Sequence, residues 1–132
     1  MEWGRSRRRS LGRASLGVAV ALLCFGFAER ATAHALLVEA IPAEAATLET
    51  SPPQLMLRFN SRIEHKLSRA ALIAGETGAP QPLVVDAATA PDRLIATLPA
   101  LAPGSYVVDW QVLSVDGHRV AGKLHFQVRG PG

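Results

Sequence analysis

The stretch Tyr106-Val107-Val108-Asp109-Trp110-Gln111-Val112-Leu113-Ser114-Val115 decides the fold class, because it is the clearest strand in the 132-residue chain. Its even-numbered positions from 106 to 112 carry Tyr, Val, Trp and Val, whereas Asp and Gln occupy positions 109 and 111. Alternation with period two predicts a β-strand with one face in a core. We therefore expect Trp110 to be buried.

Short apolar runs separated by Pro, Gly and Asp continue on both sides of this strand. About seven short strands with turn signals at close spacing are typical of an all-β sandwich or barrel. The Ala-rich stretch Ala43–Leu48 has room for one helical turn at most, because prolines flank it. The expected strands are His34–Ala40, Leu55–Phe59, Leu67–Ala74, Leu83–Val85, Arg93–Leu98, Tyr106–Val115 and Lys123–Val128.

The first 33 residues have the organisation of a signal peptide. An arginine-rich start is followed by the apolar run Leu16–Ala28 and by the small residues Ala31-Thr32-Ala33. This order predicts cleavage after Ala33, and the apolar run is shorter than the roughly 20 residues of a permanent membrane helix. Residues 1–33 are thus expected to be the leader and residues 34–132 one exported domain. The segment Ser6–Leu11 resembles a twin-arginine signal, so the Sec and twin-arginine routes both stay open.

Removal of the leader changes the charge and the thiol content. The whole chain has a net charge of +3, but six of its 14 Lys/Arg and two of its 11 Asp/Glu precede residue 34. Residues 34–132 are therefore close to neutral, and no basic patch suggests nucleic acid. The only cysteine, Cys24, lies in the leader. The exported domain is expected to have no disulfide and no thiolate ligand.

Cleavage after Ala33 would place a histidine at the mature N-terminus. The α-amine and Nδ1 of His34 can chelate one metal ion, and the backbone nitrogen of Ala35 can add a third donor. Asp116 and His118 lie two residues apart on one expected strand, with Gly117 between them, and would emerge on the same side. Two imidazoles, an amine and an oxygen suit Cu(II) or Ni(II). His118 would supply an in-plane nitrogen, and Asp116 would be an axial ligand or a hydrogen-bond partner. The site requires the first strand to run beside the sixth.

Several segments of residues 34–128 resemble the CopC family of periplasmic copper-resistance proteins. They are the opening from His34 to Glu44, Leu55–Phe59, Leu98–Tyr106, Trp110–His118 with its S-x-D-G-H order, and Gly122–Val128. The resemblance implies an immunoglobulin-like Greek-key β-barrel that binds Cu(II) in the periplasm. It also implies His34, Asp116 and His118 as the metal ligands, and a copper transporter of the CopD type in the inner membrane as a candidate partner.

Two positions depart from the pattern of that family. Many relatives hold Cu(I) in a methionine-rich loop, whereas residues 34–132 contain only Met56, which we expect to fill the core. Ser61 stands where relatives often carry a glutamate. We therefore expect one Cu(II) per mature chain and weak binding of Cu(I).

Other functions remain as alternatives to a non-enzymatic Cu(II) protein. A metal-free immunoglobulin-like interaction module would leave the position of His34 without a role. A copper monooxygenase would use a similar ligand set but needs an exposed aromatic surface. The spacing of Ser114, Asp116 and His118 does not favour a nucleophilic triad, because no G-x-S-x-G turn is present. His65 and His125 are expected to be solvated bystanders.

Overall fold

The computed structural model describes residues 35–130, in which all regular elements are strands except one short 3₁₀ turn. No helix in this range is long and apolar enough to cross a membrane. The all-β prediction is confirmed. The elements are β1 (Leu37–Ile41), β2 (Ala46–Leu48), β3 (Gln54–Phe59), η1 (His65–Leu67), β4 (Arg69–Ala74), β5 (Gln81–Pro82), β6 (Val84–Val85), β7 (Arg93–Thr97), β8 (Gly104–Leu113) and β9 (Arg119–Val128).

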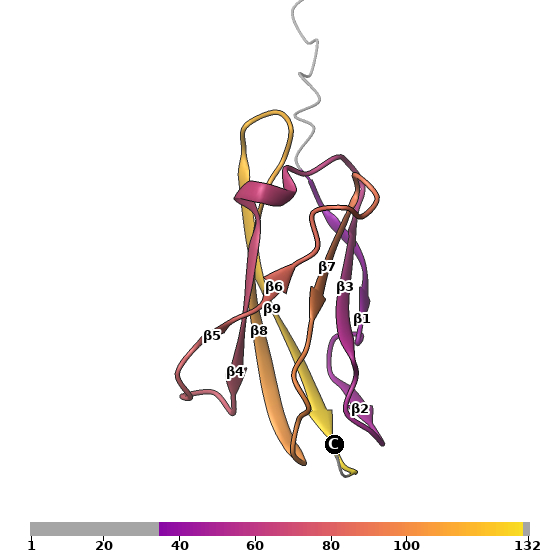
Figure 1. Cartoon of the computed structure of the whole chain (residues 1–132), viewed down its shortest axis with the longest axis vertical. Helices are drawn as coiled ribbons and strands as arrows, with labels where there is room; N and C mark the ends of the chain where they lie inside the picture. Colours follow the sequence, from indigo (N-terminus) through magenta and orange to yellow (C-terminus); the bar gives the residue numbers. More distant parts are fainter. Residues whose placement is uncertain (1–34, 131–132) are drawn as a thin grey trace, which may run out of the picture. The chain divides into compact units, whose positions relative to one another are not determined.

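Two sheets pack face to face as a sandwich (Figure 1). One sheet has the order β1-β3-β7-β6 and the other has the order β2-β9-β8-β4-β5. β8 and β9 form a long antiparallel hairpin, in which Gly104 pairs with Val128 at one end and Leu113 with Arg119 at the other. This hairpin carries the predicted Asp116–His118 segment at its turn.

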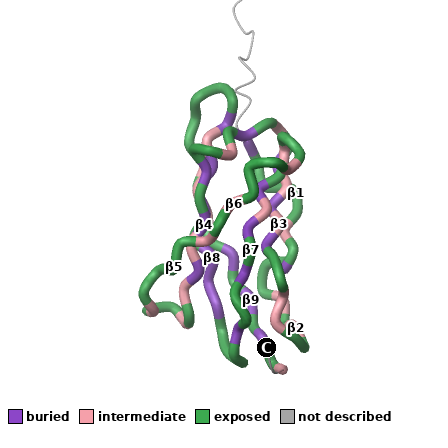
Figure 2. Tube along the Cα trace, viewed as in Figure 1, coloured by how far each residue is buried: buried purple, intermediate pink, exposed green. Residues whose placement is uncertain are grey.

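The core lies between the inner faces of the two sheets, and buried positions alternate with exposed ones along the strands (Figure 2). Trp110 is 5% exposed, as predicted, and its indole meets the Phe59 ring edge to face at 5.4 Å. Tyr106 stacks on Phe126 and donates its hydroxyl hydrogen to the carbonyl of Ala102 at 2.5 Å. A tyrosine bonded to the backbone a few residues upstream is a recurring device of immunoglobulin-like sandwiches.

Three local expectations were wrong. Ala46–Leu48 is not helical but pairs in parallel with Phe126–Val128, because a free strand edge satisfies backbone groups that one helical turn would leave unpaired. The third expected strand does not begin at Leu67, which belongs to η1, and the corresponding strand β4 begins at Arg69. The last strand begins at Arg119, four residues before the expected start, since its pairing with β8 continues up to the turn.

The first strand also has a different neighbour from the one expected. β1 pairs with β3, whereas the neighbours of β8 are β9 and β4 in the other sheet. The first strand therefore does not run beside the long central strand. The start of the described chain is connected to the end of the hairpin through residues 60–64 instead.

Candidate metal centre

A tight turn joins β8 to β9 and places Asp116 and His118 together. The Ser114 N–H donates to the His118 carbonyl at 2.9 Å, and the Gly117 N–H donates to the Ser114 carbonyl at 3.0 Å. Gly117 has φ +88°, a backbone conformation that favours glycine. A turn followed by a left-handed glycine is a common three-residue hairpin connection. The two side chains meet because of this turn and not, as expected, because they share one face of an extended strand.

The Asp116 carboxylate accepts hydrogen bonds on both oxygens. Oδ1 accepts from the Ser114 hydroxyl and from the His118 N–H at 3.1 Å, and Oδ2 lies 3.1 Å from His118 Nδ1. The Ser114 hydroxyl, followed by the bonds from His118, lowers the pKa of Asp116 to about 2. Asp116 is therefore an anion throughout the physiological pH range.

The position of this carboxylate selects the tautomer of the His118 ring. An ionised carboxylate only accepts hydrogen bonds, so the Nδ1 that faces Oδ2 carries a proton. In a neutral imidazole the lone pair then belongs to Nε2, which is the nitrogen able to coordinate a metal. A carboxylate that orients a histidine in this way is the usual support of metal-binding imidazoles.

The segment Asn60–Glu64 links the start of the described chain to this turn. Leu36 exchanges two hydrogen bonds with Asn60, one through the Asn60 side chain at 2.8 Å and one through its N–H at 3.0 Å. Three residues later Ile63 forms a β-bridge with Ser114, and the Val115 N–H donates to the Arg62 carbonyl. The chain therefore enters the fold at the end of the sandwich that carries the turn (Figure 1).

The predicted ligand His34 lies outside the described residues. The residue after it, Ala35, is fully buried in the core, so the backbone is held one position beyond the predicted N-terminus. Within residues 35–130, no group of three or more His, Cys, Asp or Glu side chains could hold a metal ion. The described part of the predicted site is thus the pair Asp116 and His118.

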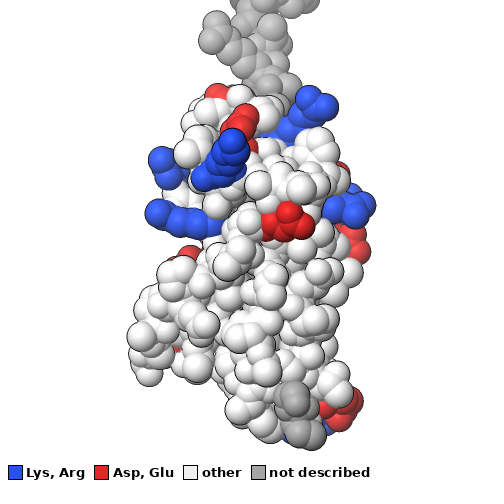
Figure 3. All heavy atoms as spheres, in the orientation of Figure 1, with Lys and Arg blue, Asp and Glu red and all other residues white. Residues whose placement is uncertain are grey.

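The surroundings of this pair do not form an acidic trap for cations. Two exposed arginines lie next to the turn. The Arg62 carbonyl accepts a hydrogen bond from the Val115 N–H, and Arg119 directly follows His118. On the face in Figure 3, charged side chains gather toward this end of the sandwich, and basic ones are prominent among them. A metal ion at this end would therefore depend on specific donor atoms and not on general attraction, and nitrogen donors suit Cu(II) whereas Ca²⁺ is bound by oxygen donors.

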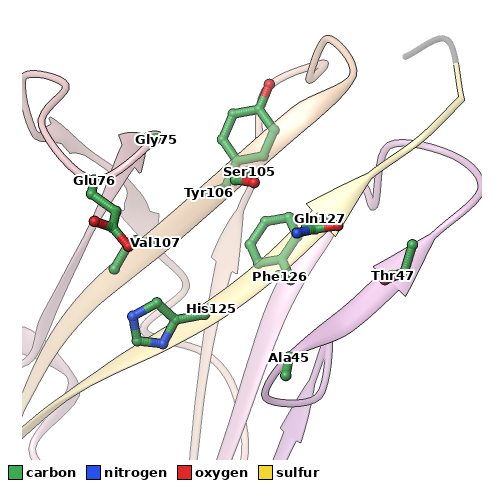
Figure 4. Close-up of a pocket in the computed structure, with 10 residues that line it drawn as sticks. All are labelled: Ala45, Thr47, Gly75, Glu76, Ser105, Tyr106, Val107, His125, Phe126 and Gln127. Atoms are coloured by element: carbon green, nitrogen blue, oxygen red, sulfur yellow. The ribbon is translucent and has the colours of Figure 1, made fainter.

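His125 forms a second carboxylate–imidazole pair on the outer face of the five-stranded sheet. Its Nδ1 lies 2.8 Å from Glu44 Oε1, and its N–H donates to Glu44 Oε2 at 3.0 Å. The hydrogen bond from the His125 N–H is the main cause that lowers the pKa of Glu44. The ring lines a pocket of about 260 Å³ whose rim also carries Glu76 and Gln127 (Figure 4). The outward direction expected of His125 is confirmed, and this pair was missed because its partners are 81 positions apart.

His65 is a structural tie and not a solvated residue as expected. Its Nε2 lies 2.7 Å from the Arg93 carbonyl, 3.1 Å from the Ala90 carbonyl and 3.1 Å from the Thr89 hydroxyl. These contacts connect η1 to the loop before β7 and to the first residue of β7.

Ser114 is the other residue whose hydrogen bonding the sequence analysis did not predict. Its place two residues before Asp116 is a signal for a hydroxyl–carboxylate hydrogen bond within a turn.

The positions of the aromatic residues and of Met56 bear on the alternative functions. Within residues 35–130, every Phe, Tyr and Trp is at most 8% exposed, so this part of the chain offers no aromatic platform for a polymer. Met56 does not fill the core as expected. It is half-buried on β3 between Ile41 and Ile95, because position 56 has the parity of the outer face while Leu55 and Leu57 point inward.

Comparisons with known proteins agree with the fold and with the extent of the domain. A model described as the CopC domain matches residues 37–129. Copper resistance protein C of Pseudomonas syringae pv. tomato is 33% identical over 109 residues, which cover 75% of this chain and 83% of the relative. Protein YobA of Escherichia coli K12 is 31% identical over 99 residues, covering 74% and 80%.

Solved structures of similar proteins have the same architecture. The crystal structure of CopC from Methylosinus trichosporium OB3b superposes with a TM-score of 0.66 at 37% identity and covers 74% of this chain and 95% of its own. PcoC, a methionine-rich copper resistance protein from Escherichia coli, gives a TM-score of 0.61 at 28% identity and covers 74% and 100%.

Proposed function

This chain belongs to the CopC family, and on that premise we propose that it is an exported protein that binds one Cu(II) ion. Residues 1–33 would be the signal peptide and residues 34–132 the periplasmic copper-binding domain. Its role would be copper resistance, homeostasis or delivery, through binding and not through catalysis. A membrane transporter of the CopD type is the partner that the family resemblance implies.

The observation that carries the proposal is the Asp116–His118 pair at the end of the sandwich where the chain enters the fold. His118 would coordinate through Nε2, because Asp116 faces its Nδ1. His34 would contribute its α-amine and Nδ1, with the Ala35 backbone nitrogen as a further donor. Asp116 would act mainly as the partner of His118, since both of its oxygens already accept hydrogen bonds. A tetragonal nitrogen set of this kind selects Cu(II) over Zn(II).

The methionine content of this chain supports Cu(II) over Cu(I) as the proposed ion. PcoC is described as methionine-rich, whereas the whole sequence of this chain contains two methionines, one of them Met1. Soft thioether or thiolate ligands are what Cu(I) prefers. Because residues 34–132 contain only Met56 and no cysteine, the proposed function is that of a Cu(II) protein with weak affinity for Cu(I).

Native mass spectrometry of the exported protein, with and without Cu(II), tests the proposal directly. The expected result is a mature chain that begins at His34 and takes up one copper ion. Paramagnetic resonance should then show an axial Cu(II) spectrum with nitrogen hyperfine splitting. A chain that retains residues before position 34, a spectrum dominated by oxygen ligands, or equal affinity for Zn(II) would contradict it.

A further inference from the structure

Ser114 is one of two buried polar residues in the described part of the chain, and its side chain contacts the Asp116–His118 pair from the core side. It is 1% exposed, and its hydroxyl donates to Asp116 Oδ1. The other such residue is Ser68, at 7% exposed, whose hydroxyl donates to the Glu64 carbonyl and accepts from the Leu113 N–H. A buried hydroxyl without a partner is costly, so each of these serines must be held by its acceptor.

A chain of hydrogen bonds runs from the core to the surface through the turn. Ser114 is 1% exposed, while the side chains of Asp116 and His118 are 29% and 56% exposed. The backbone of Ser114 is fixed by its bonds to Gly117 and His118 and by its bridge to Ile63. The hydroxyl is therefore a fixed point, whereas the two side chains beyond it would each have rotamer freedom on their own.

We propose that Ser114 is a positioning residue for metal binding. Its hydroxyl holds the Asp116 carboxylate in the orientation that faces His118 Nδ1, and the carboxylate in turn presents His118 Nε2 to the metal. The inference rests on the proposed Cu(II) site. Its physical basis is pre-organisation: an imidazole ordered in the folded protein loses less freedom when the ion binds.

A purely structural role for Ser114 makes a different prediction. The turn is closed by backbone groups of Ser114, and these persist in Ser114→Ala. If the hydroxyl only supported the fold, its loss would lower stability and leave the bound metal unchanged. If it positions Asp116, its loss lets the carboxylate rotate away from His118, and the metal site changes even where the fold is intact.

The test compares Ser114→Ala with Ser68→Ala, which removes a buried hydroxyl beside the same strand but without contact to Asp116. Partners of metal ligands typically contribute about 10–100-fold in affinity, so Ser114→Ala should weaken Cu(II) binding by about tenfold. Its paramagnetic resonance spectrum should change or split into several species. Ser68→Ala should keep the affinity and spectrum of the parent. Ser114→Thr keeps the hydroxyl and should restore most of the affinity.

A measurement on the metal-free protein separates this inference from the proposed function. Long-range ¹⁵N–¹H NMR reports which ring nitrogen of His118 carries the proton. We expect the Nδ1–H tautomer in the parent and in Ser68→Ala, and a mixture in Ser114→Ala. Absence of Cu(II) binding by the parent would overturn the proposed function but leave this tautomer shift to decide the role of Ser114. An unchanged affinity, spectrum and tautomer in Ser114→Ala would overturn the inference while the Cu(II) site stands.

Discussion

The β8–β9 hairpin carries two histidines, each paired with a carboxylate, and the two pairs differ in their surroundings. At the turn, His118 Nδ1 lies 3.1 Å from Asp116, and the pair is supported from behind by the buried Ser114. Along β9, His125 Nδ1 lies 2.8 Å from Glu44, and both side chains are more than half exposed on the outer face of a sheet. The shorter contact belongs to the pair that we do not assign to copper.

Our proposal assigns copper to only one of these two oriented imidazoles, so it requires something more than a carboxylate that faces Nδ1. The Asp116–His118 turn lies at the end of the sandwich where the described chain begins, and the proposed site would draw further donors from the residue before it, His34. The Glu44–His125 pair is anchored by β2 and β9, and no third His, Cys, Asp or Glu of the described residues completes a metal-binding group there. The distinction that we propose is that His34 would add its donors to the Asp116–His118 pair and not to the Glu44–His125 pair.

The largest expected effect comes from blocking the mature N-terminus. One extra residue before His34 would convert its α-amine into an amide and remove a donor from the chelate, while both pairs stay intact. Cu(II) affinity should fall by several orders of magnitude, as measured by competition with a chelator of known strength. Equal binding by the extended and mature proteins would mean that the N-terminus does not contribute to the site, and the proposed distinction between the two pairs would be lost.

Removal of each imidazole in turn compares the two pairs directly. His118→Ala removes a metal-binding nitrogen and should cost more than the about 10–100-fold that outer partners contribute. His125→Ala should leave the affinity within a few-fold of the parent. The two variants are matched, because each removes an imidazole whose Nδ1 faces a carboxylate. Equal damage from the two changes would move the metal site to the outer face of the sheet.

Neutralising the carboxylate of each pair should give the next smaller difference in Cu(II) affinity. Asp116→Asn removes the anion that orients His118 and should weaken Cu(II) binding by about 10–100-fold. Glu44→Gln makes the same chemical change in the other pair and should have no effect on affinity. A loss in Asp116→Asn that equals or exceeds the loss in His118→Ala would show that Asp116 is a direct ligand of greater weight than His118.

The sequence was sufficient for those features that depend on local pattern. Alternation along Tyr106–Val112 predicted the central strand and the burial of Trp110, whereas Asp116 and His118 were expected on an extended strand and lie in a turn. The pattern failed where partners are distant. The parallel strand Ala46–Leu48 exists because of the free edge of β9, and the contacts of His65 depend on the loop before β7. Neither of these long-range contacts produces a local sequence pattern by which it could be predicted.

The smallest expected effect is on the acid stability of the metal-free protein, and it separates the two pairs by pH. Hydrogen bonds lower the pKa of Asp116 from 3.8 to about 2, so they stabilise the fold above about pH 4, and that contribution is lost as the pH falls toward 2. The pKa of Glu44 is also lowered, from an ordinary value of 4.5, so its contribution should begin to fall at a higher pH. Both groups are exposed, and the effects should therefore be small.

Urea midpoints of the parent, Asp116→Asn and Glu44→Gln between about pH 2 and pH 6 measure these effects. The gap between the parent and Glu44→Gln should begin to close first, and the gap to Asp116→Asn should close at lower pH. A gap between the parent and Asp116→Asn that has closed completely by about pH 4 would mean that the turn does not lower the pKa of the Asp116 carboxylate.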